Sequence, residues 1–266
     1  MLGQELRAYS CASPMLVTMP VCGTAIVAVS LLLPLAGLQG APATSPPAEA
    51  RTQVPRAGEL NPFVLAVVKS YPADGTHTYY WPKGEADKGW KGCTKDLRYR
   101  GRLLARGDAK QRAYCCGLTF EVFLEAWMRW CKATKRKAVI KDFDLAAVRK
   151  LQAQWFGSAA DKTCLRTALC DNGLGERIVE REAAQPGDFV QLWRSNGSGH
   201  SVVFLGWQRE SGQIVGIRYW STQKRTNGIG TVVERFATKE LPGALADQTW
   251  ICRVGVGPAG AARKQR

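Results

Sequence analysis

Two adjacent cysteines and one of the chain's only two histidines are the residues of this sequence best suited to covalent chemistry. Cys115 and Cys116 begin the stretch "CCGLTFEVFLEAW", and His200 directly follows the Gly-rich turn "NGSG". A cysteine acts as a nucleophile at neutral pH when a nearby base or a lowered pKa favours its thiolate. The competing interpretation is that both cysteines are buried core residues, as cysteines commonly are.

The apolar pattern after the cysteines predicts a helix over residues 116–131. Unpaired N–H groups and the helix dipole at such an N-terminus stabilise both a thiolate and an oxyanion. The backbone N–H groups of Cys115 or Cys116 are therefore the expected oxyanion donors, and Gly117 is small enough to let a substrate approach the backbone. His77 lies in an aromatic loop whose structure the sequence does not reveal, so His200 is the better candidate base.

The rest of the chain predicts the elements that would position this pair. Further helices are expected at 59–71, 144–155 and 162–170, the last ending near Gly173, with a small hairpin inside 72–111. After residue 188 the apolar period changes to two, which predicts five strands at 189–194, 200–208, 213–222, 230–238 and 249–256. Helices followed by antiparallel strands indicate an α+β fold.

The stretches "YCCGLTFEVF" and "PGDFVQLWRSNGSGHSVVFLGW" together resemble the NlpC-type cell-wall cysteine peptidases, relatives of the CHAP amidases in the papain-like superfamily. In that family a nucleophilic cysteine begins a helix, a Pro-Gly-Asp turn leads into a strand, and a histidine begins the next strand. The resemblance covers residues 112–236. It places the nucleophile on Cys115, with Cys116 where a serine is common, and the base on His200.

The resemblance also implies a third, polar residue on the following strand, which would orient the imidazole. Tyr219, Ser221 and Gln223 share a face there by alternation, and Ser221 and Gln223 both remain open. Tyr114 stands where the family often has aspartate. The long interval between Cys115 and His200 implies an insertion around residues 132–180.

The fold implied by the resemblance is a papain-like core of the NlpC type. In it the nucleophile's helix packs on a five-stranded antiparallel sheet, and no metal or organic cofactor is needed. A zinc site is not expected, because the cysteine spacings do not fit and histidines are few.

Aromatic residues are candidates for the wall of a substrate cleft. We expect Tyr114, Trp81 and Trp220 to line it, with Tyr79, Tyr80 and Trp90 as further candidates. Ordinary aromatic packing is the competing interpretation.

The charge balance favours polyanionic surroundings. The chain has 266 residues, with 37 Lys and Arg against 22 Asp and Glu, a net charge of +15. Nucleic acid, anionic lipid or acidic wall polymer would suit this charge. No zinc finger, phosphate-binding loop or RNA-binding aromatic motif is present, so no specific nucleic-acid partner is expected. The expected partners are a peptide or peptidoglycan substrate and an anionic envelope polymer, and the protein is expected to be a monomer.

The first 43 residues have the order of a secretory signal: Arg7, an apolar run over 15–37, and small residues before a cleavage site near Ala43. A retained membrane anchor is the alternative, although Pro20 and Pro34 weaken it as a helix. We therefore expect export to the periplasm, the cell envelope or the medium, with membrane contact only if this segment is retained.

Composition divides the remainder of the chain. We expect a flexible linker over 44–60, a loop-rich aromatic segment over 61–111, a catalytic domain over 112–256 and a basic tail over 257–266.

Seven cysteines lie outside the leader: Cys93, Cys115, Cys116, Cys131, Cys164, Cys170 and Cys252. In an oxidising compartment an odd number leaves at least one thiol unpaired. Cys164 and Cys170 are close enough in sequence to bridge, but the sequence does not assign the pairs.

The expected activity is hydrolysis of an amide bond, and the resemblance points to peptidoglycan peptides. Two alternatives remain open. One is a papain-like module that binds an anionic envelope polymer without cutting it, and the other is acyl transfer or lipid-directed amidase chemistry on the same scaffold.

Overall fold

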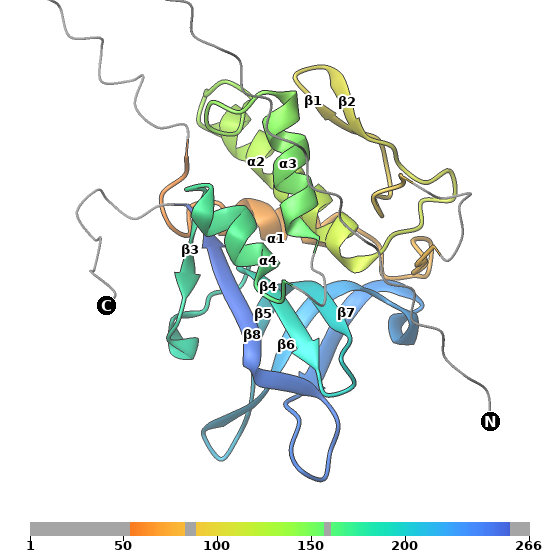
Figure 1. Ribbon diagram of the computed structural model, residues 1–266, viewed down its shortest axis with the longest axis vertical. Helices are drawn as coiled ribbons and strands as arrows, with labels where there is room; N and C mark the ends of the chain where they lie inside the picture. Colours follow the sequence, from red (N-terminus) through yellow and green to blue (C-terminus); the bar gives the residue numbers. More distant parts are fainter. Residues whose placement is uncertain (1–53, 83–88, 157–160, 256–266) are drawn as a thin grey trace, which may run out of the picture. The chain divides into compact units, whose positions relative to one another are not determined.

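The computed structural model describes residues 54–82, 89–156 and 161–255 (Figure 1). The predicted leader, most of the predicted linker and the basic tail lie outside the described residues. Within the described ranges, no helix combines the length and apolar character that a membrane span requires.

A six-stranded antiparallel sheet forms most of the C-terminal half, in the order β3-β8-β4-β5-β6-β7. The strands are β3 (Gly175–Ile178), β4 (Phe189–Arg194), β5 (Gly199–Glu210), β6 (Gln213–Gln223), β7 (Gly228–Arg235) and β8 (Ala244–Val254). All five expected strands form, so the α+β class is confirmed, but the strand count is wrong by one. The missed strand is β3, a four-residue edge strand "GERI" that is too short and too charged to show an alternating pattern.

In the described ranges, the α-helices are α1 (Asn61–Lys69), α2 (Cys115–Ala133), α3 (Leu145–Trp155) and α4 (Cys164–Arg166), and all of them precede the six-stranded sheet in the chain. The helix expected at 162–170 is only the short α4 followed by a π-helical turn, Thr167–Asp171, after which Gly173 adopts a positive φ of 66°. The expected hairpin forms from β1 (Leu97–Tyr99) and β2 (Arg102–Ala105). The segment in which an insertion was expected thus contains α3, α4 and β3.

Aromatic packing fixes α2 to the sheet. Figure 1 shows the helices gathered on one side of the strands. Phe123 of α2 contacts Trp155 of α3 at a ring separation of 5.1 Å, and Trp155 contacts Phe189 of β4 at the same separation. All three are fully buried. Such large apolar side chains supply much of the free energy of burial. Their packing therefore fixes the position of α2 relative to the sheet.

The Pro-Gly-Asp turn has a structural role that the sequence did not reveal. Asp188 is fully buried and accepts two hydrogen bonds from Arg253 of β8, both at 2.9 Å, and one from Asn61 of α1 at 2.8 Å. Gly187 has a φ of 96°, and a Cβ there would lie 2.8 Å from the Asn61 side chain. The turn therefore joins α1, β4 and β8, and so positions the strand that runs beside His200.

Candidate active site

Cys115 is the first residue of α2, so the helix begins one residue before the expected range of 116–131. The preceding residue, Tyr114, is extended, with φ −125° and ψ 163°, and no side chain caps the helix. The first backbone N–H groups of a helix lack partners within the helix, so this end can face a negative charge. Gly117 serves a different purpose from the one expected, because a Cβ there would lie 2.1 Å from the Lys91 carbonyl oxygen. Glycine permits the 91–92 loop to pack against the helix, and does not make room for substrate.

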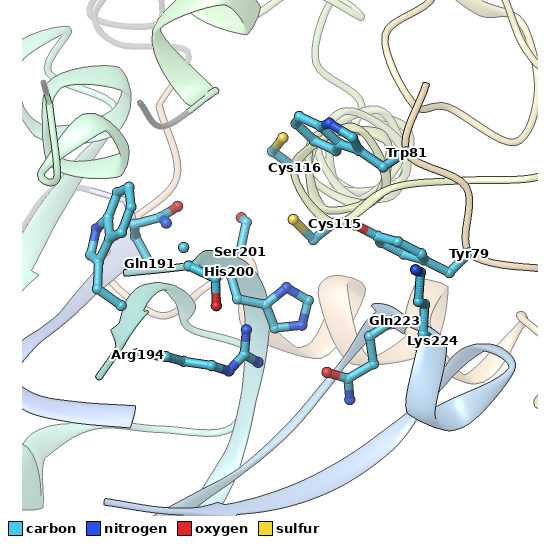
Figure 2. A pocket seen from close by; sticks show the side chains of 13 residues that line it. Tyr79, Trp81, Cys115, Cys116, Gln191, Arg194, His200, Ser201, Gln223 and Lys224 are labelled. Carbon is cyan, nitrogen blue, oxygen red and sulfur yellow. The ribbon is translucent and has the colours of Figure 1, made fainter. Parts of the chain in front are cut away.

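Cys115 and His200 line the same cleft, and Figure 2 shows the imidazole turned toward the Cys115 sulfur. The pKa of Cys115 is held well below its usual value by a hydrogen bond from the Cys116 thiol, by the His200 side chain and by the backbone N–H of Ser201; these outweigh burial. Burial and the adjacent Cys115 raise the pKa of Cys116. Of the two thiols, Cys115 is therefore the one whose surroundings favour the thiolate, with Cys116 as its hydrogen-bond donor.

Among the described residues, none orients His200 through its Nε2 atom. Nε2 is buried and makes no hydrogen bond within the described part of the chain. The Ser221 hydroxyl donates to the Ser201 carbonyl at 2.8 Å, and the Gln223 Oε1 accepts from Tyr219 at 3.3 Å. In the described chain, neither candidate third residue makes a hydrogen bond with His200 Nε2. Ser221 is sealed in the sheet, whereas Gln223 lines the cleft.

A largely buried ion-pair network lies next to the imidazole, and no sequence pattern predicted it. Glu234 of β7 accepts from Arg194 of β4 at 2.6 and 2.9 Å, and from the Tyr219 hydroxyl at 2.6 Å. The Tyr219 ring meets the His200 ring edge-on, with centroids 5.6 Å apart. Burial, followed by the Glu234 charge, raises the pKa of Tyr219 to about 12. The network thus holds the Tyr219 ring in place, and the His200 imidazole packs against this neutral phenol.

A second set of buried hydrogen bonds joins α2 to β5. Thr119, one turn into α2, lies 2.7 Å from the Ser201 hydroxyl, and Trp155 Nε1 donates to Thr119 at 3.0 Å. Because Ser201 follows His200 directly, this contact sets the spacing between Cys115 and His200.

Two polar side chains that sequence analysis did not assign a catalytic role face the cleft beside Cys115. Gln191 of β4 is buried, and its Oε1 accepts from the Cys164 thiol at 3.6 Å, which leaves its amide N–H groups as donors on the cleft side. A polar residue inside the apolar run "FVQLW" was the available signal. Tyr79 points its phenol toward Cys115 in Figure 2, because a backbone bridge to Ala113 places it next to the start of α2. Burial raises the pKa of Tyr79 to about 12, so its hydroxyl remains a donor at neutral pH.

The three aromatic residues expected to line the cleft differ in where they lie relative to it. Trp81 lines the cleft and is 52% exposed, as expected. Tyr114 is buried and supports the Trp81 ring edge-on at 4.9 Å. Trp220 is also buried and packs on Tyr71 at 5.5 Å, so it does not belong to the cleft wall. His77 lies elsewhere too, with Nδ1 2.9 Å from the Gln111 carbonyl oxygen.

The cleft has a volume of about 470 Å³ and carries positive charge. Arg194 and Lys224 contribute cations, and no Asp or Glu is among the described residues that line it. Arg194 is already neutralised by Glu234.

The seven cysteines of the described chain are all free thiols. Cys170 lies 3.9 Å from Cys252, sulfur to sulfur, and not against Cys164 as sequence proximity suggested. Within the described ranges, no group of three or more His, Cys, Asp or Glu side chains is arranged to hold a metal ion.

Comparison of the chain with models of known protein families, with curated proteins and with solved structures found no match.

Proposed function

We propose that this protein is a cysteine hydrolase that cleaves an amide bond, with Cys115 as nucleophile and His200 as base. The observation that carries the proposal is the position of Cys115 at the start of α2, in the same cleft as the His200 imidazole, and the lowered pKa of its thiol agrees with that position. A buried cysteine in an apolar setting has a raised pKa instead, as Cys93 and Cys164 do. The NlpC-type resemblance suggests peptidoglycan peptides as the substrate class. If the leader directs export, the enzyme would meet that substrate in the cell envelope.

In the proposed reaction the Cys115 thiolate attacks the amide carbonyl carbon and forms a C–S bond. The carbonyl electrons move to oxygen, and the resulting oxyanion is stabilised by the backbone N–H of Cys115 or Cys116. The side chains of Tyr79 and Gln191 line the same cleft and offer further donors. His200 then gives a proton to the leaving amine as the C–N bond breaks. Water, deprotonated by His200, hydrolyses the thioester and restores the thiolate.

The test is the rate of iodoacetamide labelling of the full chain against pH, with the modified cysteine located by peptide mass mapping. We expect fast labelling at Cys115 with an apparent pKa well below the ~8.5 of a free thiol. In the His200→Ala variant this apparent pKa should rise. Slow labelling spread over several cysteines, or a profile unchanged by the His200 substitution, would contradict the proposal. A peptide panel analysed by mass spectrometry then identifies the bond that is cut.

A second candidate is a module that binds an anionic envelope polymer without cutting it. The net charge of +15 and the absence of carboxylates among the described cleft residues favour it. This candidate predicts polymer binding that weakens steeply with salt and does not change when Cys115 is alkylated. Acyl transfer would use the same thioester with an acceptor other than water, so adding amine acceptors to the peptide panel separates it from hydrolysis.

A further inference from the structure

One cation at the edge of the cleft has no partner. Lys224 begins the short 3-10 turn Lys224–Thr226, directly after β6. It is exposed, and across the described residues no carboxylate pairs with it and no side chain accepts a hydrogen bond from its amine. Figure 2 shows this amine beside Tyr79, on the side of the cleft where Cys115 lies.

Arg194, the other cation of the described cleft lining, already has a partner. It makes a two-point ion pair with Glu234, and that carboxylate is buried, so the arginine is occupied. Lys224 is therefore left without a neutralising carboxylate, since no Asp or Glu lies among the described residues that line the cleft.

From this charge pattern we infer that Lys224 forms a subsite for a carboxylate carried by the substrate close to the amide that is cut. This inference rests on the proposed function, because it assumes that the substrate reaches Cys115. A single flexible ammonium group acts as a point charge. It suits a singly charged carboxylate, whereas a phosphate is better held by several cations or an arginine fork.

Two alkylating reagents test the subsite without knowledge of the natural substrate. Iodoacetate and iodoacetamide both react by attack of the thiolate on carbon, with loss of iodide, and they differ only in a carboxylate or a carboxamide. The measured quantity is the ratio of their rate constants at Cys115 in the full chain at low ionic strength. The variants are Lys224→Gln, Lys224→Arg and, as a control with the same loss of charge, Lys150→Gln, whose side chain is exposed on α3 and does not line the cleft.

The expected result is an iodoacetate preference that falls about two- to five-fold in Lys224→Gln, the size of an exposed charge interaction. Lys224→Arg and Lys150→Gln should retain the preference. Raising the salt concentration should reduce it in the unmodified protein, because the interaction is screened over ~10 Å at 0.1 M salt. An equal ratio in the unmodified protein and Lys224→Gln, or an equal fall in Lys150→Gln, would overturn the subsite.

The outcomes separate this inference from the proposed function. If both reagents label Cys115 rapidly but the ratio of their rate constants is the same in Lys224→Gln as in the unmodified protein, the result supports Cys115 as nucleophile and contradicts the carboxylate subsite. If neither reagent labels Cys115 faster than the other cysteines, the proposed function fails and the subsite fails with it. Once a cleaved peptide is known, its free-acid and carboxamide forms give a second readout. Lys224→Gln should then raise KM for the acid form and leave the carboxamide form unchanged.

Discussion

At the residue scale, the two adjacent thiols have opposite tendencies to ionise because their surroundings differ. Cys115 receives a hydrogen bond from Cys116 and faces His200, whereas Cys116 is buried beside a negative neighbour. The sequence singled out Cys115 and His200 as a pair, and the structure places both in one cleft. The sequence could not predict the donor role of Cys116, because that depends on side-chain directions at the first turn of the helix.

Substituting each thiol in turn should separate these roles. Cys115→Ala should abolish hydrolysis and leave the fold unchanged. Cys116→Ala should retain activity but shift the alkylation profile of Cys115 to higher pH, because the thiolate loses the hydrogen bond that contributes most to its lowered pKa. The measurement is labelling rate against pH, with far-UV circular dichroism as the control for folding. Loss of reactivity in Cys116→Ala with retention in Cys115→Ala would show that the assignment is off by one residue.

The phenol of Tyr79 gives a second prediction at this scale. If its hydroxyl donates to the oxyanion, Tyr79→Phe should lower kcat by roughly 10²-fold, the usual effect of losing one such donor, with little change in KM. Tyr80→Phe is the matched control, since Tyr80 packs under Arg112 and does not line the cleft. A Tyr79→Phe effect confined to KM would instead assign the phenol to substrate binding.

At the element scale, periodicity predicted most of the helices and strands. The features that it missed depend on contacts between segments distant in the sequence. The edge strand β3 exists because β8 offers it a partner, and its own four residues contain no pattern. Alternation predicted that Tyr219 shares a face with Ser221 and Gln223, but not that its ring would meet His200 edge-on. It could not show that Trp220 and Tyr114 would be covered by Tyr71 and Trp81. The Arg194–Glu234 pair joins β4 to β7 and has no local signature at all.

The buried ion pair of the Pro-Gly-Asp turn should contribute strongly to the free energy of unfolding. Asp188→Asn should remove the charge that balances the nearly buried Arg253. Breaking a buried pair in this way costs about 3–5 kcal/mol, which chemical denaturation would measure as a lower midpoint at an unchanged slope. Glu210→Gln breaks the exposed pair with Arg235 and should change stability little. Equal effects of the two substitutions would mean that the turn is not a structural anchor.

At the scale of the whole molecule, one buried acid joins the N-terminal segment to the nucleophile's helix. Glu121 of α2 accepts from Tyr71, just after α1, at 2.5 Å, and from the Thr94 hydroxyl and backbone N–H at 2.6 and 2.7 Å. Burial raises its pKa, although these hydrogen bonds oppose the shift. Residues 61–111 are thus attached to α2 through a carboxyl group whose charge is costly to bury.

This carboxyl group should make stability depend on pH with a defined sign. A pKa raised in the folded state means that the protonated acid stabilises the fold below its unfolded pKa, and that this contribution is lost as pH rises through the folded value. Glu234 should contribute in the opposite direction. Its pKa is lowered despite burial, because Arg194 and Tyr219 stabilise its charged form, so its contribution to the stability of the fold is lost as pH falls. Glu121→Gln should therefore flatten the decline of unfolding free energy above about pH 4.5, whereas Glu234→Gln should flatten the decline below it. Urea titrations across pH 3–8, fitted for unfolding free energy, measure both slopes. If Glu121→Gln destabilised the protein equally at every pH, the carboxyl would act only through its hydrogen bonds, and the assigned burial cost would be wrong.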